Sequence, residues 1–119
     1  MRVQRGDVIL VNYPFASGSG SKVRPAVVVQ CDRNNDRLDN TIIAQITSRT
    51  RHAKAERTQL LVEASSPTGQ QAGLLIDSAV SCENLDTVRQ DTITRIIGDV
   101  PNEIMQRIAE CLLKSLELR

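Results

Sequence analysis

Cations and hydroxyls that border two apolar runs are the side chains of this sequence best suited to chemistry. Lys22 and Arg24 stand just before one apolar run, and Thr47 and Ser48 follow another. An arginine offers planar, forked donors to phosphate oxygens and keeps its charge at neutral pH. A neighbouring hydroxyl adds a hydrogen bond to the same group. These residue types point to chemistry on a phosphate.

Other kinds of site are excluded by what surrounds these residues. Gly18, Gly20 and Lys22 suggest a phosphate-binding loop, but Val23 follows the lysine where Ser or Thr is required. His52 is the single histidine, which excludes a two-imidazole ribonuclease and a multi-histidine metal centre. RNA strand scission remains, because the 2′-hydroxyl of RNA is itself the nucleophile and the protein needs only to orient groups and stabilise charge.

Short β-rich runs separated by turn residues must position these side chains. Residues 17–21 read as a mobile loop, residues 65–69 as a turn, and Asp32, Asn34 and Asp36 as turn and helix-cap residues. The expected strands cover 8–11, 26–29, 41–46, 60–62, 74–76, 80–82 and 94–97.

The last segment changes to a helical period. Ile104, Ile108 and Leu112 recur at i, i+4 and i+8, Pro101 suits the first turn, and Glu103 favours the positive end of the helix dipole. The same apolar stripe includes Met105, Ala109, Leu113 and Leu116. The pattern predicts a mainly β protein: a small, strongly bent antiparallel sheet or barrel with one C-terminal amphipathic helix packed on it.

Length and composition limit the organisation of the chain. Its 119 residues suffice for a single domain over 1–119, and 40% hydrophobic with 24% charged residues is ordinary for a globular protein. The three cysteines are widely spaced and odd in number, which argues against disulfides and zinc. No apolar run is long enough to cross a membrane and the N-terminus lacks a signal-peptide pattern, so we expect a cytoplasmic protein.

Several spaced motifs together resemble the MazF/PemK family of toxin endoribonucleases, over nearly the whole chain. They are Arg5–Val8, Pro14–Phe15, Gly18–Lys22, Arg24–Val29, Ile42–Ser48, Val80–Thr87 and the Leu-rich end of the terminal helix. The resemblance implies an SH3-like β-barrel and a homodimer that cuts single-stranded RNA, such as messenger RNA, without a metal ion or other cofactor. The implied products carry a 2′,3′-cyclic phosphate and a 5′-hydroxyl, and a cognate antitoxin covers the RNA site with an acidic tail.

Motif by motif, the resemblance assigns the catalytic centre to Arg24, in an Arg-Pro motif, and to Thr47, the threonine that closes the third strand. Arg24 would stabilise the transition state and could donate a proton, whereas its high pKa makes it a poor base. Ser48 could share the role of Thr47, and Lys22 would meet the RNA backbone. Taken alone, Arg24 could instead be a surface ion-pair partner and Thr47 a strand cap.

The sequence departs from the PemK branch on a late strand. That branch has an arginine and an aspartate two residues apart, and the matching positions here are Ser81 and Glu83. Glu83 keeps a carboxylate that could act as the general base, but Ser81 cannot supply an acid. Asn84 replaces a common glutamine and could serve structure or RNA base reading.

A basic block directly follows Thr47 and consists of Arg49, Arg51, His52, Lys54 and Arg57. We expect it to bind phosphates that flank the cleaved bond, which gives salt-dependent affinity rather than sequence choice. A solvated loop tip would explain the same charges equally well. With Tyr13 and Phe15 as the sole aromatic residues, base selection would depend on hydrogen bonds.

Two alternatives to an endoribonuclease toxin stay open. CcdB-like toxins share the barrel and bind DNA gyrase, but they use a Trp-Gly-Ile C-terminus, whereas this chain ends in Leu118 and Arg119 and has no tryptophan. Because Ser81 breaks the PemK pattern, a catalytically inactive adaptor of the same fold is the third reading.

Overall fold

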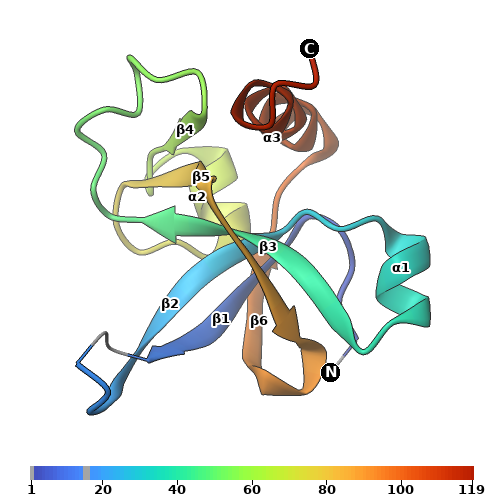
Figure 1. Ribbon diagram of the computed structural model, residues 1–119. Helices are drawn as coiled ribbons and strands as arrows, with labels where there is room; N and C mark the ends of the chain where they lie inside the picture. Colours follow the sequence, from blue (N-terminus) through green and yellow to red (C-terminus); the bar gives the residue numbers. More distant parts are fainter. Residues whose placement is uncertain (1, 15–16) are drawn as a thin grey trace.

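A computed structural model describes residues 2–14 and 17–119. Figure 1 shows a bent sheet with a helix over one end. In chain order the elements are β1 (Asp7–Pro14), β2 (Ser21–Val28), α1 (Asp32–Arg37), β3 (Asn40–Thr47), β4 (Gln59–Val62), α2 (Pro67–Ala72), β5 (Ser78–Arg89), the 3₁₀ turn η1 (Gln90–Thr92), β6 (Ile93–Asp99) and α3 (Asn102–Ser115).

All strand pairs in the described residues are antiparallel. They form one six-stranded sheet in the order β4-β5-β3-β2-β1-β6. The predicted mainly β fold with a C-terminal helix is confirmed, whereas closure into an SH3-like barrel stays a prediction. Register shifts in the β1–β6 and β3–β5 pairs bend the sheet.

Both faces of the sheet are buried around its centre. In β2, Ala26, Val27 and Val28 are each fully buried. Val27 belongs to a large core shared with α3, while its two neighbours belong to a second, smaller core with Ile9 of β1. Alternate side chains of a strand point to opposite faces, so a continuous apolar run is what two cores require.

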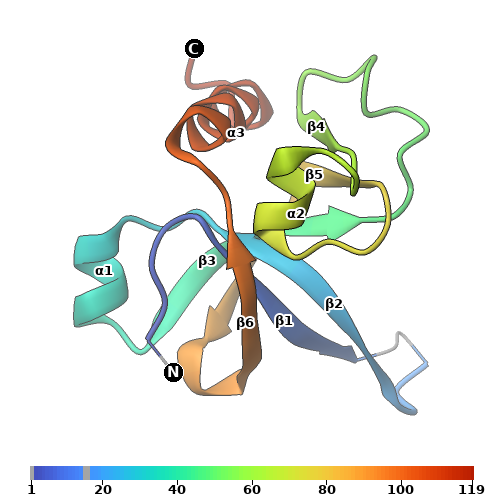
Figure 2. The ribbon, with the colours of Figure 1, turned by 180° about the vertical axis from the view of Figure 1, so that it is seen from behind.

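The terminal helix packs on the larger core as its spacing predicts. Met105, Ile108 and Cys111 are buried, and Pro101 is the residue that caps α3 rather than part of its first turn. Leu116 lies beyond the helix and is exposed, so it leaves the predicted stripe. Figure 2 shows α3 above the sheet, with α1 and β4 on opposite sides of the molecule. No helix among the described residues is long and apolar enough to span a membrane.

Two short helices occupy segments for which the sequence predicted a turn, at 65–69, or turn and helix-cap residues, at Asp32, Asn34 and Asp36. The predicted turn at 65–69 is the start of α2, because Ser66 accepts the N–H of Gly69 and Pro67 takes the first helical position. Asp32, Asn34 and Asp36 lie within α1, which Cys31 caps. Ser-Pro and Asp favour helix starts as well as turns, so residue type alone did not distinguish a short helix from a turn.

The strand predicted at 74–76 is absent from the sheet. Gly73 takes a left-handed conformation that ends α2, and Leu74 then turns into the core. Leu75 and Ile76 face solvent with no strand partner. The apolar character of residues 74–76 therefore wrongly predicted a strand.

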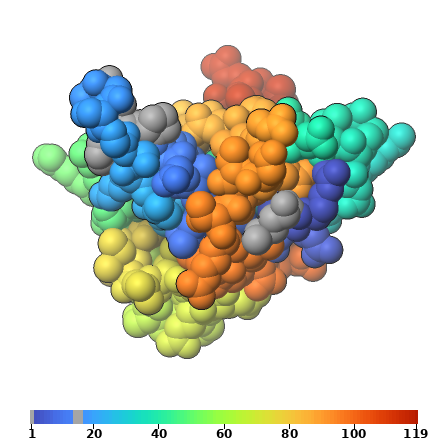
Figure 3. Space-filling model, turned by 90° about the horizontal axis from the view of Figure 1, so that it is seen from below, coloured from blue at the N-terminus to red at the C-terminus, as the bar shows by residue number. Residues whose placement is uncertain are grey.

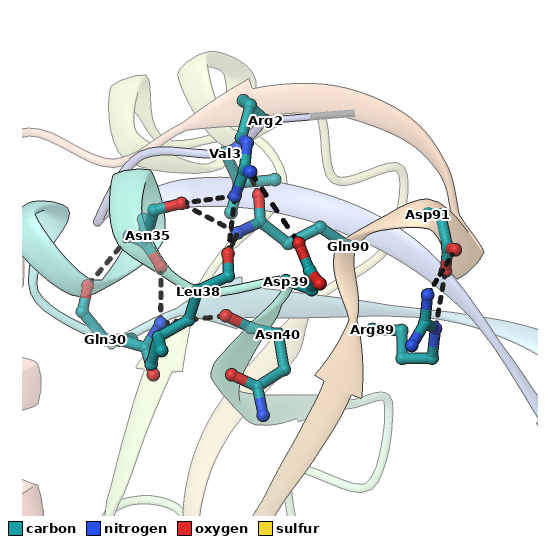
Figure 4. A network of polar contacts seen from close by, with 10 residues as sticks. All are labelled: Arg2, Val3, Gln30, Asn35, Leu38, Asp39, Asn40, Arg89, Gln90 and Asp91. Carbon is teal, nitrogen blue, oxygen red and sulfur yellow. Dashed lines mark hydrogen bonds and ion pairs between the residues drawn. The ribbon is translucent and has the colours of Figure 1, made fainter.

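A buried polar network joins the N-terminal segment to α1, the start of β3 and η1 (Figure 4). The Asn35 Nδ2 donates to the Gln30 carbonyl, and its Oδ1 accepts from Gln30 Nε2 and Thr41 Oγ1. Gln90 accepts the N–H of Val3 and donates to the Asn35 carbonyl. Each buried polar group thus gains a partner that offsets its desolvation.

Candidate functional site

A cavity of about 520 Å³ opens where β2 and β3 separate. Hydrogen-bonded pairing between these strands ends at Ala26 and Gln45, after which β2 stays paired only with β1 and β3 only with β5. The segment 73–78 and strand β6 form the other walls, and Figure 3 shows β2 in blue, this segment in yellow and β6 in orange meeting on one face. The lining residues are Leu10, Lys22, Val23, Arg24, Pro25, Ile46, Thr47, Ser48, Gly73, Leu74, Leu75, Ile76, Ser78, Arg95 and Ile97.

Arg24 and Thr47 both line this cavity, from the two separating strands. Arg24 is exposed and its side chain makes no hydrogen bond or ion pair with any described residue, so its guanidinium is free to meet an anion. Thr47 is half-buried, and its hydroxyl accepts the N–H of Arg49 at 3.1 Å. That contact uses one lone pair and leaves the hydroxyl proton for a ligand.

The charges around the cavity all have one sign. Lys22, Arg24 and Arg95 line it, and no Asp or Glu is among its lining residues in the described chain. Lys22 and Ser48 were predicted site residues, and the structure brings both to the same cavity as Arg24 and Thr47. Arg95 was missed, because a single arginine inside an apolar strand carries no motif.

A polar cluster of Tyr13, Gln45 and Asp86 adjoins Arg24, and none of the three lines the cavity. The Tyr13 hydroxyl is buried without a hydrogen-bond partner. Burial raises the pKa of Tyr13, the nearby Asp86 raises it further, and Arg24 opposes them. Gln45 donates to the Asp86 carboxylate at 3.0 Å. The sequence alone singled out Tyr13 as one of two aromatic residues and gave Asp86 no role.

Glu83 and Asn84 lie outside the cavity lining. Glu83 accepts hydrogen bonds from Thr58 Oγ1 at 2.5 Å and from Gln59 Nε2 at 3.2 Å. Asn84 donates to Ser81 Oγ at 3.0 Å, and Ser81 is 2% exposed. The structure therefore places these two predicted residues outside the cavity that Arg24 and Thr47 line.

The basic block lies on the connection between β3 and β4. Its side chains, Arg49, Arg51, His52, Lys54 and Arg57, are exposed, and none of them lines the cavity. Figure 1 shows this connection projecting on the same side of the molecule as the β1–β2 hairpin. The block thus flanks the cavity rather than forming it.

Phe15, the other aromatic residue, lies outside the described residues. Among those that the structure does describe, no three His, Cys, Asp or Glu side chains gather in a way that could hold a metal ion.

Two bacterial endoribonucleases match the chain over nearly its full length. It is 30% identical over 119 residues to the endoribonuclease EndoA of Bacillus subtilis (strain 168), covering 99% of this chain and 97% of that protein. It is 29% identical over 120 residues to the endoribonuclease MazF9 of Mycobacterium tuberculosis (strain ATCC 25618 / H37Rv), covering 98% of each.

Solved structures share the fold. A mycobacterial endoribonuclease in complex with its cognate antitoxin matches with a TM-score of 0.77 at 19% identity, covering 98% of this chain and 97% of that one. A MazE–MazF structure from Deinococcus radiodurans has a TM-score of 0.75 at 13% identity, covering 100% and 99%. The family model for the PemK-like, MazF-like toxin of type II toxin–antitoxin systems matches residues 4–116, and the chain belongs to this family.

Proposed function

We propose that this protein is a toxin endoribonuclease that cleaves single-stranded RNA by attack of the 2′-hydroxyl on the adjacent phosphate. The products would carry a 2′,3′-cyclic phosphate and a 5′-hydroxyl, and no metal ion would take part. The observation that carries the proposal is that the unpaired, exposed Arg24 and Thr47 line one cavity whose charged lining residues are all cations. Family membership and two relatives named endoribonuclease support it.

Arg24 would stabilise the pentacoordinate phosphate, because its forked donors match two nonbridging oxygens. Thr47 would donate its free hydroxyl proton to the same phosphate, and Ser48 would assist from the next position. We assign the general base to Glu83 on chemical grounds, since a carboxylate accepts the proton of the 2′-hydroxyl more readily than a guanidinium does. The hydrogen bonds from Thr58 and Gln59 would orient it.

Binding would depend on the cations around this centre. Lys22 and the basic block of Arg49, Arg51, His52, Lys54 and Arg57 would contact phosphates on either side of the cleaved bond. Asn84 would read a base edge through its amide, competing with its contact to Ser81. We place this activity in the cytoplasm, in a homodimer, with a cognate antitoxin as protein partner. A solved relative with this fold was determined with its cognate antitoxin, which supports the last assignment.

Cleavage of a mixed single-stranded RNA pool in the presence of EDTA tests the proposal. We expect cyclic-phosphate ends from the wild type and loss of at least about 10²-fold in rate for Arg24→Ala, the usual cost of removing one transition-state donor. Arg33→Ala is the matched control, because Arg33 is exposed on α1 and does not line the cavity. No cleavage by the wild type, or equal rates for the two variants, would overturn the proposal.

A further inference from the structure

We propose that Asp86 is a specificity-determining residue, whose carboxylate accepts a hydrogen bond from the exocyclic amino group of an RNA base next to the cleaved phosphate. Gln45 is the residue that positions this carboxylate. The inference rests on the proposed function and names the bases that the same site prefers, which are cytosine, adenine and guanine over uracil. The carrying observation is that Asp86 lies on the same face of the sheet as Arg24, as the one carboxylate of a polar patch.

Strand registers and the two cores decide which side chains share the face of Arg24. Arg24 lies opposite Val11, and Val11 belongs to the smaller core. Gln45 and Asp86 lie opposite Ala26 and Ile43 of the same core. Side chains alternate between faces along a strand, so the face of the smaller core continues into a polar patch at the strand ends. The patch consists of Tyr13 on β1, Lys22 and Arg24 on β2, Gln45 and Thr47 on β3, and Asp86 on β5.

The bend of the sheet brings β5 close to β1 on this face. Strands β3 and β2 lie between β5 and β1, and three strand spacings are about 14 Å on a flat sheet. The Asp86 carboxylate nevertheless lies close enough to the Tyr13 hydroxyl to raise the pKa of Tyr13, and Arg24 lowers the same pKa. Tyr13 therefore has both the carboxylate and the guanidinium as neighbours.

Gln45 connects Asp86 to the residues that we assign to the cleaved phosphate. Its Nε2 donates to Asp86 Oδ2 at 3.0 Å. Arg24 precedes Ala26 by two residues, and Ala26 lies opposite Gln45, so Gln45 and Arg24 are diagonal neighbours on one face. Thr47 is the next residue of β3 on that face. A phosphate bound at Arg24 and Thr47 is thus one side chain away from the Asp86 carboxylate.

The charges of the patch favour a base over a phosphate at Asp86. Asp86 is half-buried and makes no ion pair with any described residue, and its Oδ1 accepts no hydrogen bond from them. The carboxylate repels phosphates, which Lys22 and Arg24 attract instead. A half-buried carboxylate gains from N–H donors, and the amino groups of cytosine, adenine and guanine supply them. Uracil has a carbonyl oxygen where cytosine has its amino group, and two acceptors repel each other.

Binding of 2′-O-methyl oligocytidine and oligouridine, which lack the nucleophile, tests the base contact without cleavage. We measure fluorescence anisotropy for the wild type, Asp86→Asn, Gln45→Leu and the control Asp36→Asn, which removes a carboxylate from an exposed position on α1. The wild type and the control should bind oligocytidine about 10- to 100-fold more tightly than oligouridine, the range for a hydrogen bond to a charged group.

The two patch variants should lower this ratio. Asp86→Asn should bring it close to one, because its amide can donate to the uracil carbonyl. Gln45→Leu should lower it less, because the carboxylate remains but loses the bond that holds it. A ratio for Asp86→Asn equal to that of Asp36→Asn would overturn the assignment.

Cleavage-site profiles of a mixed RNA pool locate the contact. The wild type should avoid uracil at one position beside the cut, and Asp86→Asn should accept uracil there while its thermal unfolding midpoint stays that of the wild type. A loss of base preference at every position together with a lowered midpoint would overturn the proposal, because it would assign Asp86 a structural role. Cleavage by the wild type and its loss in Arg24→Ala test the proposed function separately, so the two failures are distinguishable.

Discussion

Arg24 of β2 and Thr47 of β3 line one cavity because the pairing of their strands stops at Ala26 and Gln45. Had the ladder continued in register, these two residues would face each other within the sheet and the space between them would be closed. The separation of the strands instead leaves an opening in which a guanidinium and a hydroxyl can approach one phosphate from different sides.

Replacing Thr47 tests the hydroxyl that we assign to the phosphate. Thr47→Val should lower kcat about 10²- to 10³-fold, because it removes one hydrogen bond to the transition state. Thr47→Ser should retain most of the rate, since it keeps both the hydroxyl proton and the acceptor for the Arg49 N–H. Single-turnover kinetics provide the measurement, and equal rates for the two variants would contradict the role.

The pH dependence of cleavage tests Glu83 as the base. Glu83→Gln should lower kcat about 10²- to 10⁴-fold and remove the acidic limb of the pH–rate profile. Asp86→Asn is the control, because it removes a carboxylate elsewhere on β5 that has no assigned catalytic role. If Glu83→Gln keeps the acidic limb, or if only Asp86→Asn loses it, Glu83 is not the general base.

Thiol alkylation should separate the three cysteines. Burial raises the pKa of Cys82 to about 12 and raises that of Cys111, so both stay protonated and unreactive at neutral pH. Cys31 is exposed. We therefore expect one fast addition of iodoacetamide to the native protein and three after unfolding, as counted by mass spectrometry. Fast labelling of Cys111 in the folded protein would show that the packing of α3 on the sheet does not protect this thiol.

Tyr13 should make the protein less stable at alkaline pH. Its folded-state pKa is raised above the unfolded value of 10.0, so the unfolded chain loses this proton first. The free energy of unfolding therefore falls as the pH rises above about 10. Because Tyr13 is the single tyrosine, phenolate absorbance follows it directly. Asp86→Asn should lower its pKa, since Asp86 raises it, and an unchanged titration would contradict this contact.

Gly73 should tolerate no side chain. Its φ is +75° and a Cβ would overlap the Ile97 carbonyl, so Gly73→Ala should lower the free energy of unfolding by about 2–4 kcal/mol. Gly18 has a similar φ of +80° but open space around it. Gly18→Ala should cost about 1 kcal/mol, the backbone contribution alone. Denaturant unfolding compares the two, and equal losses would mean that the contact with Ile97 relaxes.

The sequence alone identified the elements with strong local patterns. The period of Ile104, Ile108 and Leu112 specified α3, because a helix repeats its buried face every three to four residues. The apolar runs in β1, β2 and β3 specified strands for the same kind of reason. The ordered motifs around Arg24 and Thr47 indicated the family and predicted four residues that line the cavity, Lys22 and Ser48 included.

Tertiary structure decided the rest, because those features depend on residues distant in the chain. Leu75 and Ile76 look like a strand in sequence, and the contact of Gly73 with β6 is what keeps them out of the sheet. Arg95 has no motif, and it reaches the cavity because β6 pairs with β1. Local patterns encode which face of an element is apolar, whereas the joining of strand ends into a cavity is set by long-range pairing that no local pattern contains.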